Sequence, residues 1–184
     1  MSKLLPNWVE PSIQGLTYWI GYKKQLYVSG ILNEGAIVSE LATLINSNLK
    51  EGEKIKCEDY YREMSDEIIS EERADIAIYN KKKLQYLIEV KRSDSRQSLI
   101  NNDFIKLCKL KSIYTDVRCF VLLVCQGKIP QFYVSDDGVA DGIKYPIIDT
   151  KFSKKAVRVC KSTSSFKEES LLKANYAILI EVIK

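Results

Sequence analysis

The chain has 184 residues, of which 46% are hydrophobic and 28% are charged, and its formal net charge is +4. These values are typical of one ordinary globular domain, and no stretch approaches the roughly 20 consecutive apolar residues of a membrane span. The mild basic excess permits contact with a polyanion but does not require it.

Histidine and several sequence motifs are missing, and their absence excludes particular kinds of catalytic and binding site. The sequence has no histidine, which excludes His-based triads, His metal ligands and His general bases. Its five cysteines form no Cys-x-x-Cys pair and are odd in number, so neither a zinc site nor a disulfide framework is indicated. There is no glycine-rich phosphate loop, so no nucleotide cofactor is expected. The first residues lack the apolar core of a signal peptide, and a cytoplasmic location is the expectation.

The first segment, residues 1–30, is rich in aromatic residues. Pro11 and Ser12 predict a helix that runs to about Tyr27. Its rings and lysines are suited to stacking on bases, to covering the core or to forming a homodimer contact, and the sequence leaves these alternatives open.

The clearest helix follows Asn33, which is expected to cap its first turn. Ile37, Leu41 and Leu44 repeat at helical spacing and predict a buried face. Glu40 lies at the edge of this face, so it gains importance if the helix packs beside the next two strands.

After a strand predicted over Lys54–Tyr61, two short runs of alternating apolar residues predict a hairpin with its turn at Asn80–Lys83. A turn centred on Lys82 sets Asp75 opposite Glu89, and Lys91 shares the face of Glu89 because side chains alternate along a strand. Two carboxylates directly opposite each other are destabilising unless a positive charge lies between them.

The remaining elements are predicted in the order helix, strand and three shorter strands. The helix begins near Asn101, and the apolar run Arg118–Cys125 predicts a buried strand that pairs in parallel with the second hairpin strand. The shorter strands are expected at Gln131–Val134, Ala156–Cys160 and Tyr176–Ile183. The last of these is expected to complete or edge the sheet.

Together these elements predict an α/β fold, with a mixed central β-sheet flanked by helices in the order α-β-β-β-α-β. We expect one domain over residues 1–184, made of an aromatic N-terminal helical segment (1–30), a core (33–126) and a C-terminal β-rich extension (127–184).

This order of elements, with Asp75 on one strand and Glu89-Val90-Lys91 on the next, resembles the PD-(D/E)XK nuclease superfamily. The resemblance implies a restriction-endonuclease-like core in which Asp75 and Glu89 bind the metal and Lys91 assists the attacking water. Some members add a helical Glu near the metal, and Glu40 is the matching position. Ala74 stands where the family motif has Pro, a position that varies within the superfamily.

The chemistry of phosphodiester hydrolysis gives an independent reason for these residue types. Mg²⁺ binds a few carboxylates and keeps several waters, which suits Asp75 and Glu89. We expect Mn²⁺ to substitute for Mg²⁺. The backbone carbonyl of Val90 is a further candidate ligand, and Lys91 is placed to orient the water and to stabilise the developing charge.

Four basic residues follow the hairpin and are candidates for contact with phosphates: Arg92, Arg96, Lys106 and Lys109. The sequence therefore predicts a Mg²⁺-dependent endonuclease that acts on DNA. One alternative is an RNA nuclease, for example a toxin that cleaves tRNA. The other is a non-catalytic module that binds nucleic acid or protein on the same scaffold.

Overall fold

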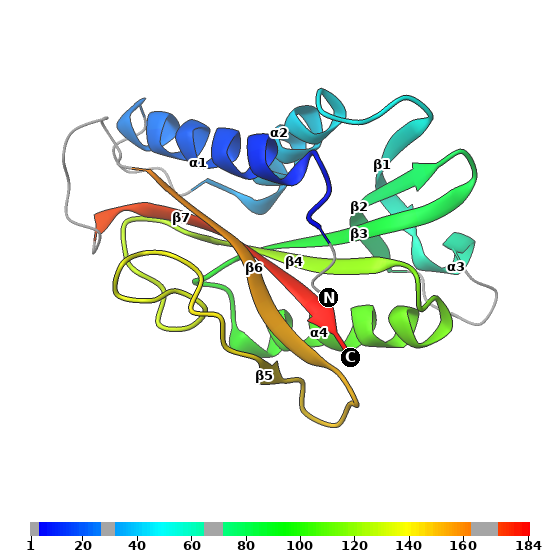
Figure 1. Ribbon diagram of the computed structural model, residues 1–184. Helices are drawn as coiled ribbons and strands as arrows, with labels where there is room; N and C mark the ends of the chain where they lie inside the picture. Colours follow the sequence, from blue (N-terminus) through cyan, green and yellow to red (C-terminus); the bar gives the residue numbers. More distant parts are fainter. Residues whose placement is uncertain (1–3, 27–31, 65–71, 163–172) are drawn as a thin grey trace.

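The protein is built on one seven-stranded sheet with helices on both faces (Figure 1). The computed structural model describes residues 4–26, 32–64, 72–162 and 173–184. The strand order is β1-β2-β3-β4-β7-β6-β5, and the β3–β4 pair is parallel whereas all other neighbours are antiparallel. The strands are β1 (Glu53–Tyr60), β2 (Arg73–Asn80), β3 (Lys83–Arg92), β4 (Arg118–Cys125), β5 (Tyr145–Pro146), β6 (Ser153–Ser162) and β7 (Asn175–Ile183).

The helices divide between the two faces of the sheet. Helices α1 (Val9–Leu26) and α2 (Glu34–Asn46) cover one face, and α4 (Gln97–Ile113) covers the other (Figure 1). The short α3 (Tyr61–Met64) follows β1 directly. Helix α2 begins as the sequence predicts, because the side chain of Asn33 accepts a hydrogen bond from the Ala36 amide at 2.7 Å.

The sheet separates two hydrophobic clusters. The first joins the strands to α1 and α2 and includes Trp8, Leu16, Ile37, Ile88 and Phe120. The second joins the strands to α4 and includes Phe104, Leu107, Val121, Ile178 and Ile180. Strand β4 contributes to both clusters and is buried along its whole length, which explains its continuous apolar sequence.

The element order α2-β1-β2-β3-α4-β4 agrees with the prediction, apart from the short α3 between β1 and β2. Strand β7 differs from the expectation, because it lies between β4 and β6 in the interior of the sheet and not at an edge. The strand expected at Gln131–Val134 is absent: Val134 forms an isolated bridge with Ala140. The helices α1 and α4 begin earlier than expected, and the predicted end of the first helix at Tyr27 lies outside the described residues.

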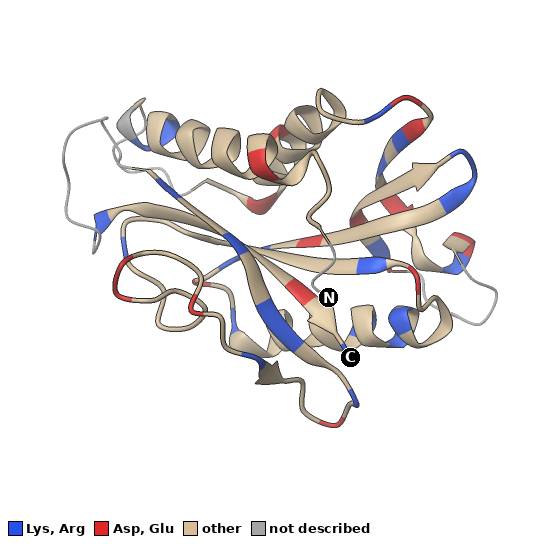
Figure 2. Ribbon diagram, in the orientation of Figure 1, with Lys and Arg blue, Asp and Glu red and all other residues tan. Residues whose placement is uncertain are grey.

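Two general properties of the described chain bear on function. None of its helices has the length and the apolar character needed to cross a membrane. Its Lys and Arg residues are spread over α4, β6 and the tip of the β2–β3 hairpin, and they do not form a single basic face (Figure 2). Any contact with a polyanion therefore depends on local groups of charges more than on the overall field.

The interior position of β7 predicts a strong dependence of stability on its side chains. Leu179 is fully buried in this strand, whereas Leu99 is 50% exposed in α4. Leu179→Ala should lower the free energy of unfolding by about 2–5 kcal/mol, whereas Leu99→Ala should change it by less than about 0.5 kcal/mol. Urea denaturation of the two variants measures both values, and equal losses would contradict the placement of β7.

Candidate functional site

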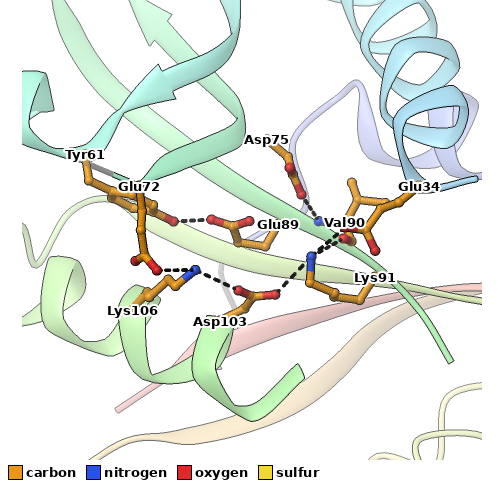
Figure 3. Close-up of polar contacts among 9 residues, drawn as sticks. All are labelled: Glu34, Tyr61, Glu72, Asp75, Glu89, Val90, Lys91, Asp103 and Lys106. Atoms are coloured by element: carbon orange, nitrogen blue, oxygen red, sulfur yellow. Dashed lines mark hydrogen bonds and ion pairs between the residues drawn. The ribbon is translucent and has the colours of Figure 1, made fainter. Parts of the chain in front are cut away.

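The site lies where β2 begins and β3 ends, on the face of the sheet that α4 covers (Figure 3). Ile76 pairs with Ile88 in the β2–β3 ladder, and the same register extended by one residue sets Asp75 opposite Glu89. The turn alone does not produce this register, because Asn80 pairs with Lys83. A bulge after Ile78 shifts the pairing by one residue, and this shift brings the two carboxylates to the same face.

Backbone and side-chain donors hold the two carboxylates. The Val90 amide donates to Asp75 Oδ2 at 2.6 Å, and the hydroxyl of Tyr61 donates a hydrogen bond to Glu89 Oε1 (Figure 3). Asp75 is half-buried, whereas Glu89 is only 3% exposed. The two carboxyl groups are close enough to share a hydrogen bond when one of them is protonated. Asp75 and Glu89 therefore converge at the ends of neighbouring strands.

Lys91 lies beside this pair, and oxygen atoms from three elements surround its ammonium group. Its Nζ contacts Glu34 Oε1 at 2.7 Å, the Val90 carbonyl at 3.1 Å and Asp103 Oδ2 at 3.4 Å. The Val90 carbonyl therefore faces the site, while the Val90 side chain is buried in the opposite cluster with α1 and α2.

Helix α4 supplies a second pair of charges. Asp103 also contacts Lys106, whose Nζ lies 3.2 Å from Asp103 Oδ1 and 3.3 Å from Glu72 Oε1. Lys91, Asp103, Lys106 and Glu72 thus form a continuous chain of alternating charges (Figure 3). They belong to the wall of a cleft of about 420 Å³, whose other lining residues are Leu99, Asn102, Ile105 and Lys109.

Burial makes the two central carboxylates difficult to ionise. It raises the pKa of Asp75, although the Val90 amide and the charge of Lys91 oppose this effect. The pKa of Glu89 is raised well above its usual range by burial and then by the charge of Asp75, and the hydrogen bond from Tyr61 only partly offsets both. Both shifts therefore disfavour the ionised forms of the two carboxyls.

The neighbouring groups keep their protons. Burial and the charge of Glu89 raise the pKa of Tyr61 well above its usual range, so its hydroxyl remains a donor. Burial alone would lower the pKa of Lys91, but the hydrogen bond to Glu34 and the charge of Asp103 outweigh burial and raise it. Lys91 is therefore an ammonium ion at neutral pH and not a general base.

The carboxylate of α2 that contacts Lys91 is Glu34, whereas the prediction named Glu40 as the helical carboxylate. Glu34, in the first turn of α2, contacts Lys91 and adds its charge near Asp75. Within the described residues no hydrogen bond or ion pair joins Glu40 to this site. Glu40 lies six residues further along α2, about 9 Å along the helix axis.

The predicted basic residues divide into two groups. Lys106 and Lys109 both line the cleft, and Lys106 contacts the charged residues of the site. Arg92 instead pairs with Asp94 in the loop after β3, and Arg96 immediately precedes α4. Of the four, Lys106 and Lys109 are thus the two that face the cleft.

Glu34, Tyr61, Glu72 and Asp103 were not predicted as site residues. For Asp103 the sequence does contain a signal, since Ile100, Phe104 and Leu107 define the buried face of α4 and Asp103 lies on that face. A charged residue at such a position is rarely left without a partner. Glu34 has no comparable signal, because a first-turn Glu is also expected from its interaction with the helix dipole.

The chemistry of the donors fits a hard divalent cation. No group of three or more Asp, Glu or Cys side chains suited to a metal occurs among the residues that the structure describes. Mg²⁺ needs only one or two carboxylates when waters and a carbonyl complete its ligands. Asp75, Glu89 and the Val90 carbonyl provide that set, and a bound cation would favour the ionised forms of the two carboxyls, whose pKa values burial raises.

Comparison of the chain with protein-family models, with curated proteins and with solved structures finds no match. Functional inference for this protein therefore depends on the geometry and the electrostatics of its own residues.

The raised pKa of Glu89 makes stability depend on pH. The folded state binds this proton more tightly than the unfolded state, so the free energy of unfolding falls as pH rises from about 4.3 towards the raised pKa. Glu89→Gln removes the titrating group and therefore this fall in the free energy of unfolding, and its side-chain carbonyl can still accept a hydrogen bond from Tyr61. In EDTA, the melting temperature of the variant should match that of the wild type near pH 4 and exceed it increasingly towards pH 8.

The exposed substitution Glu51→Gln makes the same change in charge away from the site and serves as the control. A difference between Glu89→Gln and wild type that stays constant across this pH range would contradict the account.

Proposed function

We propose that the protein is a metal-dependent nuclease with a restriction-endonuclease-like core, which hydrolyses phosphodiester bonds in DNA. The observation that carries this proposal is the convergence of Asp75, Glu89 and Lys91 at the ends of β2 and β3. The order of elements around these residues supports it, as does a cleft beside them that contains two further lysines.

The charges of the site favour a binding role over a purely structural one. Glu34, Glu72, Asp75, Glu89 and Asp103 contribute carboxyl groups, whereas Lys91 and Lys106 contribute the ammonium groups. A pair of buried carboxyls that repel each other lowers the stability of the fold. Such a cost is explained if the pair binds a cation, and functional sites are where such pKa shifts gather.

Each residue has a distinct part in the proposed reaction. Asp75, Glu89 and the Val90 carbonyl would hold Mg²⁺, or Mn²⁺ in its place. When bound, the cation neutralises charge on the phosphate and lowers the pKa of a bound water. The Val90 amide orients Asp75, and Tyr61 orients Glu89.

Lys91 acts as a cation in this scheme. Its ammonium group can hold the attacking water or a phosphate oxygen and stabilise the negative charge that develops there. Because its pKa is raised, Lys91 does not accept the proton of the water. In the proposed reaction, the proton of the attacking water is therefore transferred to an acceptor other than Lys91. Glu34 replaces Glu40 as the helical carboxylate of the site, through its contact with Lys91.

The proposal is tested by cleavage of plasmid DNA with Mg²⁺ or EDTA, using Asp75→Asn and Lys91→Met. Both variants should lower the cleavage rate by about 100-fold or more, because each removes a group that acts on the reacting phosphate. Asp116→Asn is the control, since Asp116 pairs with Lys83 at the hairpin tip. Circular dichroism should show that all three variants fold.

Undiminished cleavage by Asp75→Asn would refute the assignment of the site, and cleavage that persists in EDTA would refute the role of the metal. A parallel incubation with total RNA identifies which nucleic acid is the substrate. Cleavage of RNA without cleavage of DNA would show that the substrate is RNA and not DNA.

A further inference from the structure

Lys106 contacts two carboxylates that differ greatly in burial. Asp103 lies 3.2 Å away and its side chain is 5% exposed, whereas Glu72 lies 3.3 Å away and its side chain is 55% exposed. The two distances are nearly equal, but the free energy needed to separate each pair is not. An exposed ion pair contributes little to stability, whereas separating a buried charge from its partner is strongly destabilising.

Asp103 cannot leave Lys106 without disturbing the catalytic strand. Its second oxygen lies 3.4 Å from Lys91, so one buried carboxylate bridges both ammonium groups. This bridge fixes the positions of Lys91 and Lys106 relative to each other. Glu72 immediately precedes β2, and its contact with Lys106 is exposed to solvent where that of Asp103 is buried.

The contact between Glu72 and Lys106 lies within the cleft beside the proposed catalytic centre (Figure 3). Lys109 and Asn102 line the same cleft. An anion that enters the cleft from solvent can replace the Glu72 carboxylate on Lys106, because both are oxygen anions and Lys106 remains an ammonium ion. The pKa of Lys106 is raised, since Asp103, Glu89 and Glu72 outweigh the opposing effect of burial.

We propose that Lys106 and Lys109 form a subsite for a backbone phosphate adjacent to the scissile one. When no nucleic acid is bound, the Glu72 carboxylate pairs with Lys106 in place of this phosphate and acts as an internal competitor, which we call the internal carboxylate. This inference rests on the proposed nuclease function. Binding of nucleic acid then exchanges the contact with Glu72 for a contact with phosphate. Glu72 therefore weakens binding and disfavours anions that make few other contacts.

The test is the affinity of Glu72→Gln for a fluorescein-labelled 20-base-pair DNA duplex, measured by fluorescence anisotropy in EDTA. An RNA duplex of the same sequence forms the second arm. The variant should bind about two- to fivefold more tightly than wild type, the equivalent of one exposed ion pair. The slope of log K against log salt should steepen by about one, because one more lysine is available to a phosphate.

Asp116→Asn is the matched control. It removes the same charge from another exposed carboxylate that pairs with a lysine, Lys83, about 20 Å from Glu89 along β3. This control should leave the affinity nearly unchanged. Lys106→Gln should weaken binding, and Glu72→Gln added to Lys106→Gln should then have no more effect than Asp116→Asn.

If the wild type binds DNA but Glu72→Gln binds no more tightly than Asp116→Asn, the role of Glu72 as an internal carboxylate is refuted, while the proposed nuclease function stands. An equal gain from Glu72→Gln in the Lys106→Gln background would also refute it, because the effect would not pass through Lys106. If no variant binds either polymer, both this inference and the proposed function fail.

Discussion

The candidate site depends on one structural feature, the bulge in the β2–β3 ladder. The turn pairs Asn80 with Lys83, and this register continued without interruption would place Asp75 opposite Ile88. Asp75 and Glu89 would then point to opposite faces of the sheet. The extra residue is Gln85 in β3, which has no partner between the Ile78–Tyr86 and Tyr79–Leu84 pairs. It restores the alignment of the two carboxylates, so a local irregularity several residues away determines whether they meet.

The parallel pairing of β3 with β4 positions the remaining charges. A parallel connection requires a crossover, and α4 provides it by leaving the end of β3 and returning along the sheet. Asp103 and Lys106 consequently lie over the strand ends that carry Glu89 and Lys91. The buried Asp103 then links α4 to β3 through Lys91, which couples the packing of the helix to the geometry of the candidate site.

The two central carboxyls oppose the stability of the fold, because burial disfavours their ionised forms. The fold has abundant apolar contacts on both faces of its sheet, so it tolerates two carboxyls whose charges are poorly compensated. The raised pKa values of Asp75 and Glu89 express this cost, and a cation would remove it. In the proposed reaction Lys91 would not accept the proton of the water, because its pKa is raised.

Local patterns predicted those features that depend on neighbours in the chain. Alternation identified the hairpin, and the Asn33 cap placed the start of α2. The alignment of Asp75 with Glu89 depends on a bulge that alternation does not predict. The interior position of β7 depends on pairing between distant segments, although its uninterrupted apolar run was a usable signal. The choice of Glu34 over Glu40 depends on which end of α2 packs beside β3, and periodicity within the helix cannot show this.

The central claim is that Asp75 and Glu89 bind a divalent cation, and the most direct test is electron paramagnetic resonance of Mn²⁺ added to purified protein. The account predicts that the wild type binds Mn²⁺, that Mg²⁺ competes for the same site, and that Asp75→Asn and Glu89→Gln each lose this binding while remaining folded. Absence of binding to the wild type, or equal binding to both variants, would contradict it.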